Sequence, residues 1–84
     1  MDARLISYYF CRVNSNINNV FGKKVAEMRK RLNISQEELG DRCGLHRTYI
    51  GAIERGEKSP TLDTVEKIAK GLSVPVCELF SEIK

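Results

Sequence analysis

Apolar residues recur along this chain at the spacing of an amphipathic helix. In the stretch 20–32, four larger apolar residues follow one another at intervals of three or four positions, so that they share one face of a predicted helix. This apolar stripe consists of Phe21, Val25, Met28 and Leu32. The solvated face of the same helix is expected to carry Lys23, Lys24, Lys30 and Arg31.

The stretch 35–55 contains two shorter helical patterns, which Gly44 separates. Ser35 and Glu38 have the spacing of a capping box, in which each side chain satisfies a free backbone N–H of the other residue. Gly44 suits the end of the first helix because glycine adopts a left-handed turn at little cost. Gly40 leaves room for a close approach of the helix that follows.

The second helix of this stretch is expected over residues 46–55. The inner face of the two helices is apolar and consists of Leu39, Cys43, Leu45, Tyr49, Ile50 and Ile53. The outer face of the second helix carries short or polar residues, which are His46, Arg47, Thr48, Gly51 and Ala52. This combination is typical of a helix-turn-helix, whose second helix lies in the major groove of DNA.

Two further helices are expected in the C-terminal part of the chain. The first is capped by Thr61 or Ser59 beside Pro60, which blocks helix continuation. Its inner face consists of Leu62, Val65, Ile68, Ala69 and Leu72. A short helix then follows Pro75. Apolar residues on and after this last helix form a predicted dimer surface, consisting of Val76, Leu79, Phe80 and Ile83.

The predicted fold is all-α, a compact bundle of five helices. Residues 20–84 form the domain, and residues 1–19 form an N-terminal extension of uncertain structure. The apolar residues of this extension share one helix face but also suit a short strand, and they are Leu5, Ile6, Tyr9, Phe10 and Val13. Because five apolar side chains are unfavourable in water, the segment 5–13 is expected to pack on the domain or to contact a second copy or a protein partner.

The composition fits one small globular domain that dimerisation would stabilise. The chain has 84 residues, of which 42% are hydrophobic and 30% are charged, and its net charge is only +3. Residues 1–58 carry 11 Lys and Arg against 7 Asp and Glu, whereas residues 59–84 carry 3 against 4. The positive excess therefore lies on the part that contains the predicted recognition helix, although a mildly basic solvated surface would give the same balance.

The remaining composition gives no sign of a cofactor, metal or catalytic site. The three cysteines form no Cys-x-x-Cys, and one histidine cannot complete a zinc set. Cys43 and Cys77 are expected to be free thiols that fill the core. No apolar stretch is long enough to span a membrane, so we expect a cytoplasmic protein that is not an enzyme.

The predicted recognition helix carries the side chains that read DNA. Arg47 can donate two hydrogen bonds to guanine, Thr48 can bond a base or contact a thymine methyl, and Ala52 can touch a thymine methyl. Gln36, at the start of the preceding helix, can meet a base or a phosphate. Phosphate contacts are further expected from Tyr49, Arg55 and Lys58. Each of these residues alone is also common on any solvated helix.

The motifs of residues 20–80 resemble those of the Cro/lambda-repressor-like (XRE-type) helix-turn-helix regulators. They are Ser-Gln-Glu-Glu-Leu-Gly, Leu-His-Arg-Thr-Tyr-Ile, Ile-Glu-Arg-Gly and Pro-Thr-Leu-Asp-Thr-Val-Glu-Lys-Ile-Ala-Lys-Gly-Leu, in this order. The resemblance implies a five-helix fold, a homodimer and a palindromic operator in double-stranded DNA, with DNA contacts from Gln36, Arg47, Thr48, Ala52, Arg55 and Lys58. It also implies a partly buried ion pair between Arg29 and Glu54. Where the family usually has alanine, this chain has Gly40.

Within that family, Arg-Thr-Tyr-Ile at positions 47–50 is similar to the reading helices of restriction–modification controller proteins. This similarity implies a small dimer that regulates its own operon and the nuclease gene. The alternative is an antitoxin-type interaction protein that masks a partner and regulates its own operon, and for that role the segment 5–13 is the candidate surface.

Overall fold

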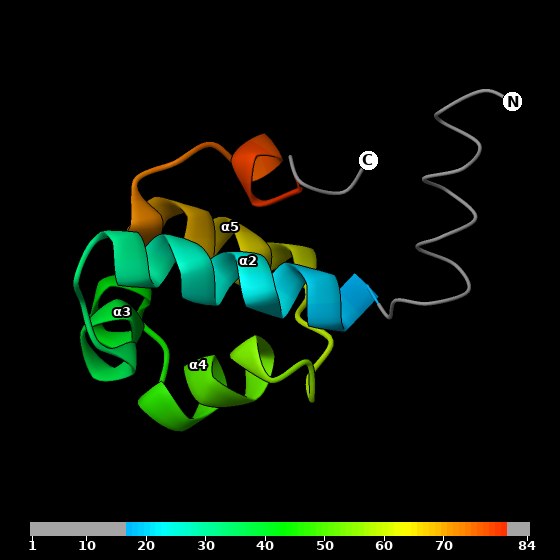
Figure 1. Cartoon of the computed structure of the whole chain (residues 1–84), viewed down its shortest axis with the longest axis horizontal. Helices are drawn as coiled ribbons and strands as arrows, with labels where there is room; N and C mark the ends of the chain where they lie inside the picture. The colour runs from blue at the N-terminus through cyan, green and yellow to red at the C-terminus, as the bar shows by residue number, and fades with distance from the viewer. Residues whose placement is uncertain (1–16, 81–84) are drawn as a thin grey trace, which may run out of the picture.

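The computed structural model describes residues 17–80, which fold as helices joined by short turns. The helices are α2 (Ile17–Arg31), α3 (Gln36–Cys43), α4 (Arg47–Glu54), α5 (Leu62–Leu72) and a 3-10 helix, η1 (Val76–Phe80). In Figure 1, α2 runs along the middle of the molecule, with α3 and α4 on one side of it and η1 on the other. The all-α prediction is confirmed for these residues, which contain no strand.

The expected count of five helices is confirmed only in part, because the described residues contain four α-helices and one 3-10 helix. The segment after Pro75 has only five residues, and its Glu78 N–H donates to the Pro75 carbonyl at 3.0 Å, an i to i+3 bond. A run this short closes the tighter 3-10 turn because it is too short to establish α-helical bonds. The apolar spacing of three residues between Val76 and Leu79 fits either helix type.

The first described helix begins earlier than expected. Its bounds are Ile17–Arg31, whereas the sequence predicted a start near residue 20. In its first turn, the side chain of Asn19 lies against Gly56, which has a φ of +78°. The helix also ends before Leu32, which is 45% exposed and does not continue the buried stripe. The segment 1–16 lies outside the described residues.

One hydrophobic core joins all of these helices. Its fully buried side chains come from every element and are Val25, Leu39, Ile50, Ile53, Ile68 and Leu79. Burying a side chain of this size stabilises the fold by about 1.5–3 kcal/mol relative to leaving it in water. The predicted inner faces are therefore largely correct, because helical periodicity reports which side of a helix faces the core.

Several inner and outer assignments are wrong, and each error lies where neighbouring elements override the periodicity. Leu62 was expected inside but is 86% exposed, because it is the first residue of α5 and extends past the packed face. Lys24 was expected outside but is only 5% exposed, and its ammonium lies 4.0 Å from the Glu27 carboxylate. Leu79 was expected at a dimer surface but is completely buried.

The two described cysteines differ in environment. Cys43 is buried in the core, as expected, whereas Cys77 is exposed, so its expected core role is wrong. Burial raises the pKa of the Cys43 thiol, and the nearby Arg42 charge opposes this rise only in part. The buried thiol therefore stays protonated and acts as a small apolar side chain. None of the helices within residues 17–80 has the length and apolar character needed to cross a membrane.

Candidate nucleic-acid interface

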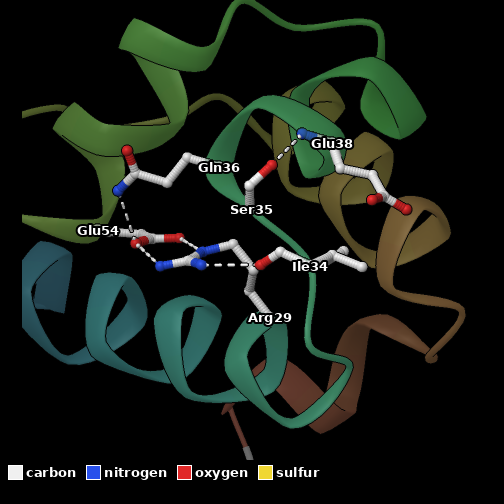
Figure 2. Close-up of polar contacts among 6 residues, drawn as sticks. All are labelled: Arg29, Ile34, Ser35, Gln36, Glu38 and Glu54. Atoms are coloured by element: carbon white, nitrogen blue, oxygen red, sulfur yellow. Dashed lines mark hydrogen bonds and ion pairs between the residues drawn. The ribbon is translucent and has the colours of Figure 1, made fainter.

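The helix α3 begins at a side-chain cap. The Ser35 hydroxyl accepts a hydrogen bond from the Glu38 backbone N–H at 3.0 Å (Figure 2). The capping box also predicts that the Glu38 carboxylate accepts from the Ser35 backbone N–H. Instead, this carboxylate accepts a hydrogen bond from Arg42 at 2.8 Å. The Ser35 cap is enough to satisfy one of the free N–H groups at the helix start, so the beginning of α3 is fixed locally.

A tight turn follows α3 and sets the approach of α4. Gly44 has a φ of +73°, and its N–H donates to the Gly40 carbonyl, so it ends the helix as predicted. A Cβ on Gly40 would lie 2.5 Å from the Leu45 carbonyl oxygen. An alanine at position 40, as the family usually has, would therefore require the backbone of the following turn to shift.

The helix α4 begins at an unusual cap. His46 is the N-cap, and its Nδ1 accepts a hydrogen bond from the Thr48 backbone N–H at 3.1 Å. The prediction that His46 starts this helix is confirmed, and the cap fixes the first turn that carries Arg47 and Thr48.

The exposed part of α4 is confined to its first turn. Arg47 and Thr48 are exposed, and Tyr49 is half-buried against the core. The guanidinium of Arg47 lies 3.1 Å from the carboxylate of Glu37 in the first turn of α3. The first turns of α3 and α4 therefore both contribute exposed side chains, and this pair links them.

The rest of the predicted outer face of α4 is buried. Ala52 is 7% exposed, so the expectation that it points outward is wrong. Gly51 is also buried, and a Cβ built on it would lie 3.1 Å from Arg55 Nη1 and 3.2 Å from Gln36 Oε1. The cause is that α4 has only eight residues and packs against both α2 and α3, which leaves a narrow free face.

An ion pair fixes the end of α4 to α2. The Arg29 Nε lies 2.7 Å from Glu54 Oε2, and Arg29 Nη2 lies 3.0 Å from Glu54 Oε1 (Figure 2). The two side chains are 12% and 7% exposed, and Arg29 Nη1 also donates to the Ile34 carbonyl at 2.9 Å. The hydrogen bond from Arg29 to Glu54 raises the pKa of Arg29 above its ordinary value. The two residues that the family resemblance pairs are thus in contact, and both oxygens of Glu54 are satisfied.

The same carboxylate also holds Gln36. Gln36 Nε2 donates to Glu54 Oε1 at 3.0 Å (Figure 2). Since a carboxylate can only accept, the amide NH₂ faces Glu54 and the amide oxygen lies over Gly51. No sequence pattern predicts this contact, because residues 36 and 54 lie on different helices. Gln36 keeps one N–H and its carbonyl oxygen for other partners.

Two cations lie after the end of α4. Arg55, at the C-cap, donates to the two oxygens of Glu57 at 2.7 and 3.3 Å, and this contact lowers the pKa of Glu57. Lys58 is exposed. The predicted phosphate-binding residues Arg55 and Lys58 are therefore accessible at the opposite end of α4 from Arg47, with Arg55 partly neutralised by its neighbour.

The residues of the predicted dimer surface separate into three groups. Leu79 belongs to the core, and Ile83 lies outside the described residues. Val76 is 41% exposed, and Phe80 is half-buried with its ring stacked on Phe21 at a centroid distance of 5.4 Å. Sequence reasoning missed two exposed apolar residues beside Phe80, namely Ile17 and Leu62, which line an apolar groove with it.

No group of three or more metal-ligating side chains comes together within residues 17–80. The polar side chains relevant to binding are the hydrogen-bond donors around α4. Arginine, threonine and glutamine side chains supply the hydrogen-bond patterns that fit base edges, and the flanking cations fit phosphates.

Comparison with known proteins gives matches over most of the chain. The helix-turn-helix family model HTH_3 matches residues 25–79. The control protein C.BamHI of Bacillus amyloliquefaciens is 49% identical over 69 residues, which cover 81% of this chain and 85% of that protein. The control protein C.SmaI of Serratia marcescens is 41% identical over 66 residues, which cover 79% of each chain.

A solved structure is similar as well. The crystal structure of the restriction-modification controller protein C.AhdI from Aeromonas hydrophila superimposes with a TM-score of 0.74 and 36% identity. The match covers 75% of this chain and 96% of that chain.

Proposed function

This chain belongs to the helix-turn-helix family HTH_3, and we propose that it is a sequence-specific DNA-binding transcriptional regulator of a restriction–modification operon. The observation that carries the proposal is the first turn of α4. There the His46 cap and the turn at Gly44 present Arg47 and Thr48 to solvent. A helix N-terminal turn of this kind is the part of a recognition helix that contacts base edges.

The side chains around α4 divide into base-reading and phosphate-binding groups. Arg47 would donate two hydrogen bonds to guanine N7 and O6, and Thr48 would contact a neighbouring base. Gln36 would use its second N–H or its carbonyl oxygen at a base or phosphate. Phosphate contacts would come from Tyr49, Arg55 and Lys58, which set affinity and register rather than sequence choice. We leave Ala52 out of the reading set because it is buried.

The restriction–modification role rests on similarity to named proteins. A control protein is 49% identical, and a restriction-modification controller protein shares the fold at 36% identity. Such identity over most of both chains favours a common role over the antitoxin-type alternative. The candidate surface of that alternative, residues 5–13, lies outside the described residues. The role is regulatory, and we propose no enzymatic activity.

The regulator is proposed to act as a homodimer on a palindromic operator. Exposed apolar surface around the groove formed by Ile17, Leu62 and Phe80, together with Val76, would be covered by a second copy. A two-fold axis would then place the two α4 helices about 34 Å apart, which matches one turn of DNA.

Replacing Arg47 with alanine tests the reading role. We expect the affinity for a selected operator duplex to fall about tenfold to a hundredfold, because one bidentate base contact is worth about 1–3 kcal/mol. Affinity for a random duplex should change far less, and the free energy of unfolding should stay within about 0.5 kcal/mol because the side chain is exposed. Fluorescence anisotropy on both duplexes, with urea unfolding in parallel, measures these quantities.

The matched control is Arg31→Ala. Arg31 is an equally exposed arginine that also pairs with a glutamate, but it lies at the end of α2. An equal loss of affinity on both duplexes for the Arg47 variant, or an equal loss for both variants, would count against base reading by Arg47.

A further inference from the structure

The pair between Glu37 and Arg47 connects the two helices of the helix-turn-helix. Arg47 Nη1 lies 3.1 Å from Glu37 Oε2, and the residues are ten positions apart. The neighbouring pairs Arg42–Glu38 and Arg31–Glu27 each lie within one helix, at the ordinary i, i+4 spacing. The Glu37 contact thus crosses the turn and acts on the side chain proposed to read a base.

This pair is too exposed to serve the stability of the fold. The side chains of Arg47 and Glu37 are 64% and 66% exposed, and contacts of this kind contribute little to folding. Together with Asp41 and His46, the two residues line a hollow at the start of α4. Because the pair lies at the proposed DNA surface, we expect it to affect DNA binding rather than folding.

We propose that Glu37 is a positioning residue that holds the Arg47 guanidinium at the base-reading surface and away from phosphates. An unpaired arginine at a helix N-terminus is repelled by the positive end of the helix dipole and has many rotamers. Near DNA such a side chain would bind any phosphate within reach. The contact with Glu37 restricts those rotamers, and its negative charge disfavours an approach to the DNA backbone that brings no base contact.

The geometry leaves Arg47 able to read a base while it is held. The guanidinium has five N–H donors, and the Glu37 contact engages Nη1. The edge formed by Nε and Nη2 stays available for guanine N7 and O6, the bidentate contact expected of a reading arginine. Holding and reading can therefore occur together, which would preorganise the side chain before it meets DNA.

The proposal rests on the proposed function and predicts a change in discrimination. In Glu37→Gln, we expect binding to random duplex to tighten and the ratio of operator to random affinity to fall about threefold to tenfold. The salt dependence on random duplex should steepen by about 0.9 in the slope of log K against log salt, because Arg47 gains a phosphate contact. Both quantities come from anisotropy titrations of the full chain over a salt series.

The matched control is Glu38→Gln, which removes the same charge from the neighbouring position. Glu38 pairs with Arg42 rather than with Arg47. Glu38→Gln should leave the affinity ratio within about twofold of the unchanged protein. In an Arg47→Ala background, Glu37→Gln should no longer lower the affinity ratio, because its effect acts through Arg47.

Three outcomes would overturn the proposal. Equal ratios in the Glu37 and Glu38 variants would show that only net charge matters. An unchanged salt slope on random duplex would show that Arg47 gains no phosphate contact. A loss of operator affinity that persists in the Arg47→Ala background would show that Glu37 reads a base itself. If the unchanged protein does not discriminate between operator and random duplex, the proposed function fails instead, so the two failures are distinguishable.

Discussion

Replacing Glu54 with alanine is expected to lower the free energy of unfolding by about 3–5 kcal/mol. The change would leave the Arg29 guanidinium, 12% exposed, with the Ile34 carbonyl as its remaining described partner. It would also remove the acceptor that fixes the Gln36 amide. A buried charge that loses its counter-ion cannot recover its lost hydration, which is why a single deletion costs more than the pair contributes. Urea unfolding followed by circular dichroism measures the effect.

The matched control removes both charges at once. A double variant, Arg29→Met with Glu54→Leu, replaces the pair by apolar side chains of similar size and should be more stable than Glu54→Ala alone. If the single variant loses less than about 1 kcal/mol, or if the double variant is the less stable of the two, the ion pair does not have the structural role that its burial indicates.

Replacing Gly22 with alanine is expected to destabilise the fold by about 3 kcal/mol or more. A Cβ at this position would lie 2.2 Å from the Ile53 carbonyl oxygen and 2.8 Å from that of Glu54. These are backbone atoms at the end of α4, so relief requires α2 and α4 to move apart rather than a side chain to rotate. The separation would also disturb the Arg29–Glu54 pair, which spans the same two helices.

The control for Gly22 is Gly51→Ala. A Cβ on Gly51 meets the ends of two flexible side chains, those of Arg55 and Gln36, at 3.1 and 3.2 Å. These side chains can shift, and alanine favours a helix over glycine by about 1 kcal/mol, so Gly51→Ala should cost far less than Gly22→Ala. Equal unfolding free energies for the two variants would contradict the close packing of α2 on α4.

What the sequence predicted well is what nearby residues determine. The Ser35 cap, the turn at Gly44 and the apolar stripe of α2 depend on neighbours within one or two turns of helix. The capping box was only half right because Arg42 competes for the Glu38 carboxylate one turn further along. Local patterns therefore gave the helix-turn-helix nearly completely.

The errors lie where tertiary packing decides. Ala52 and Gly51 have the spacing of an outer face, but α2 and α3 cover most of a helix as short as α4. Leu62 begins α5 and lies outside its packed face, whereas Leu79 of η1 lies inside the core. The hydrogen bond from Gln36 to Glu54 joins residues that are far apart in the sequence, so no local pattern predicts it. The Arg29–Glu54 pair could be expected only from the family resemblance.

The central claim is that the first turn of α4 reads a specific DNA sequence from a two-fold symmetric dimer. Selection of bound duplexes from a random pool by the full chain tests it most directly. We predict a two-fold symmetric consensus whose half-sites lie about 10 base pairs apart, with a guanine in each half-site that Arg47→Ala no longer selects. A pool that remains random after repeated selection, or a consensus unchanged by Arg47→Ala, would contradict this account.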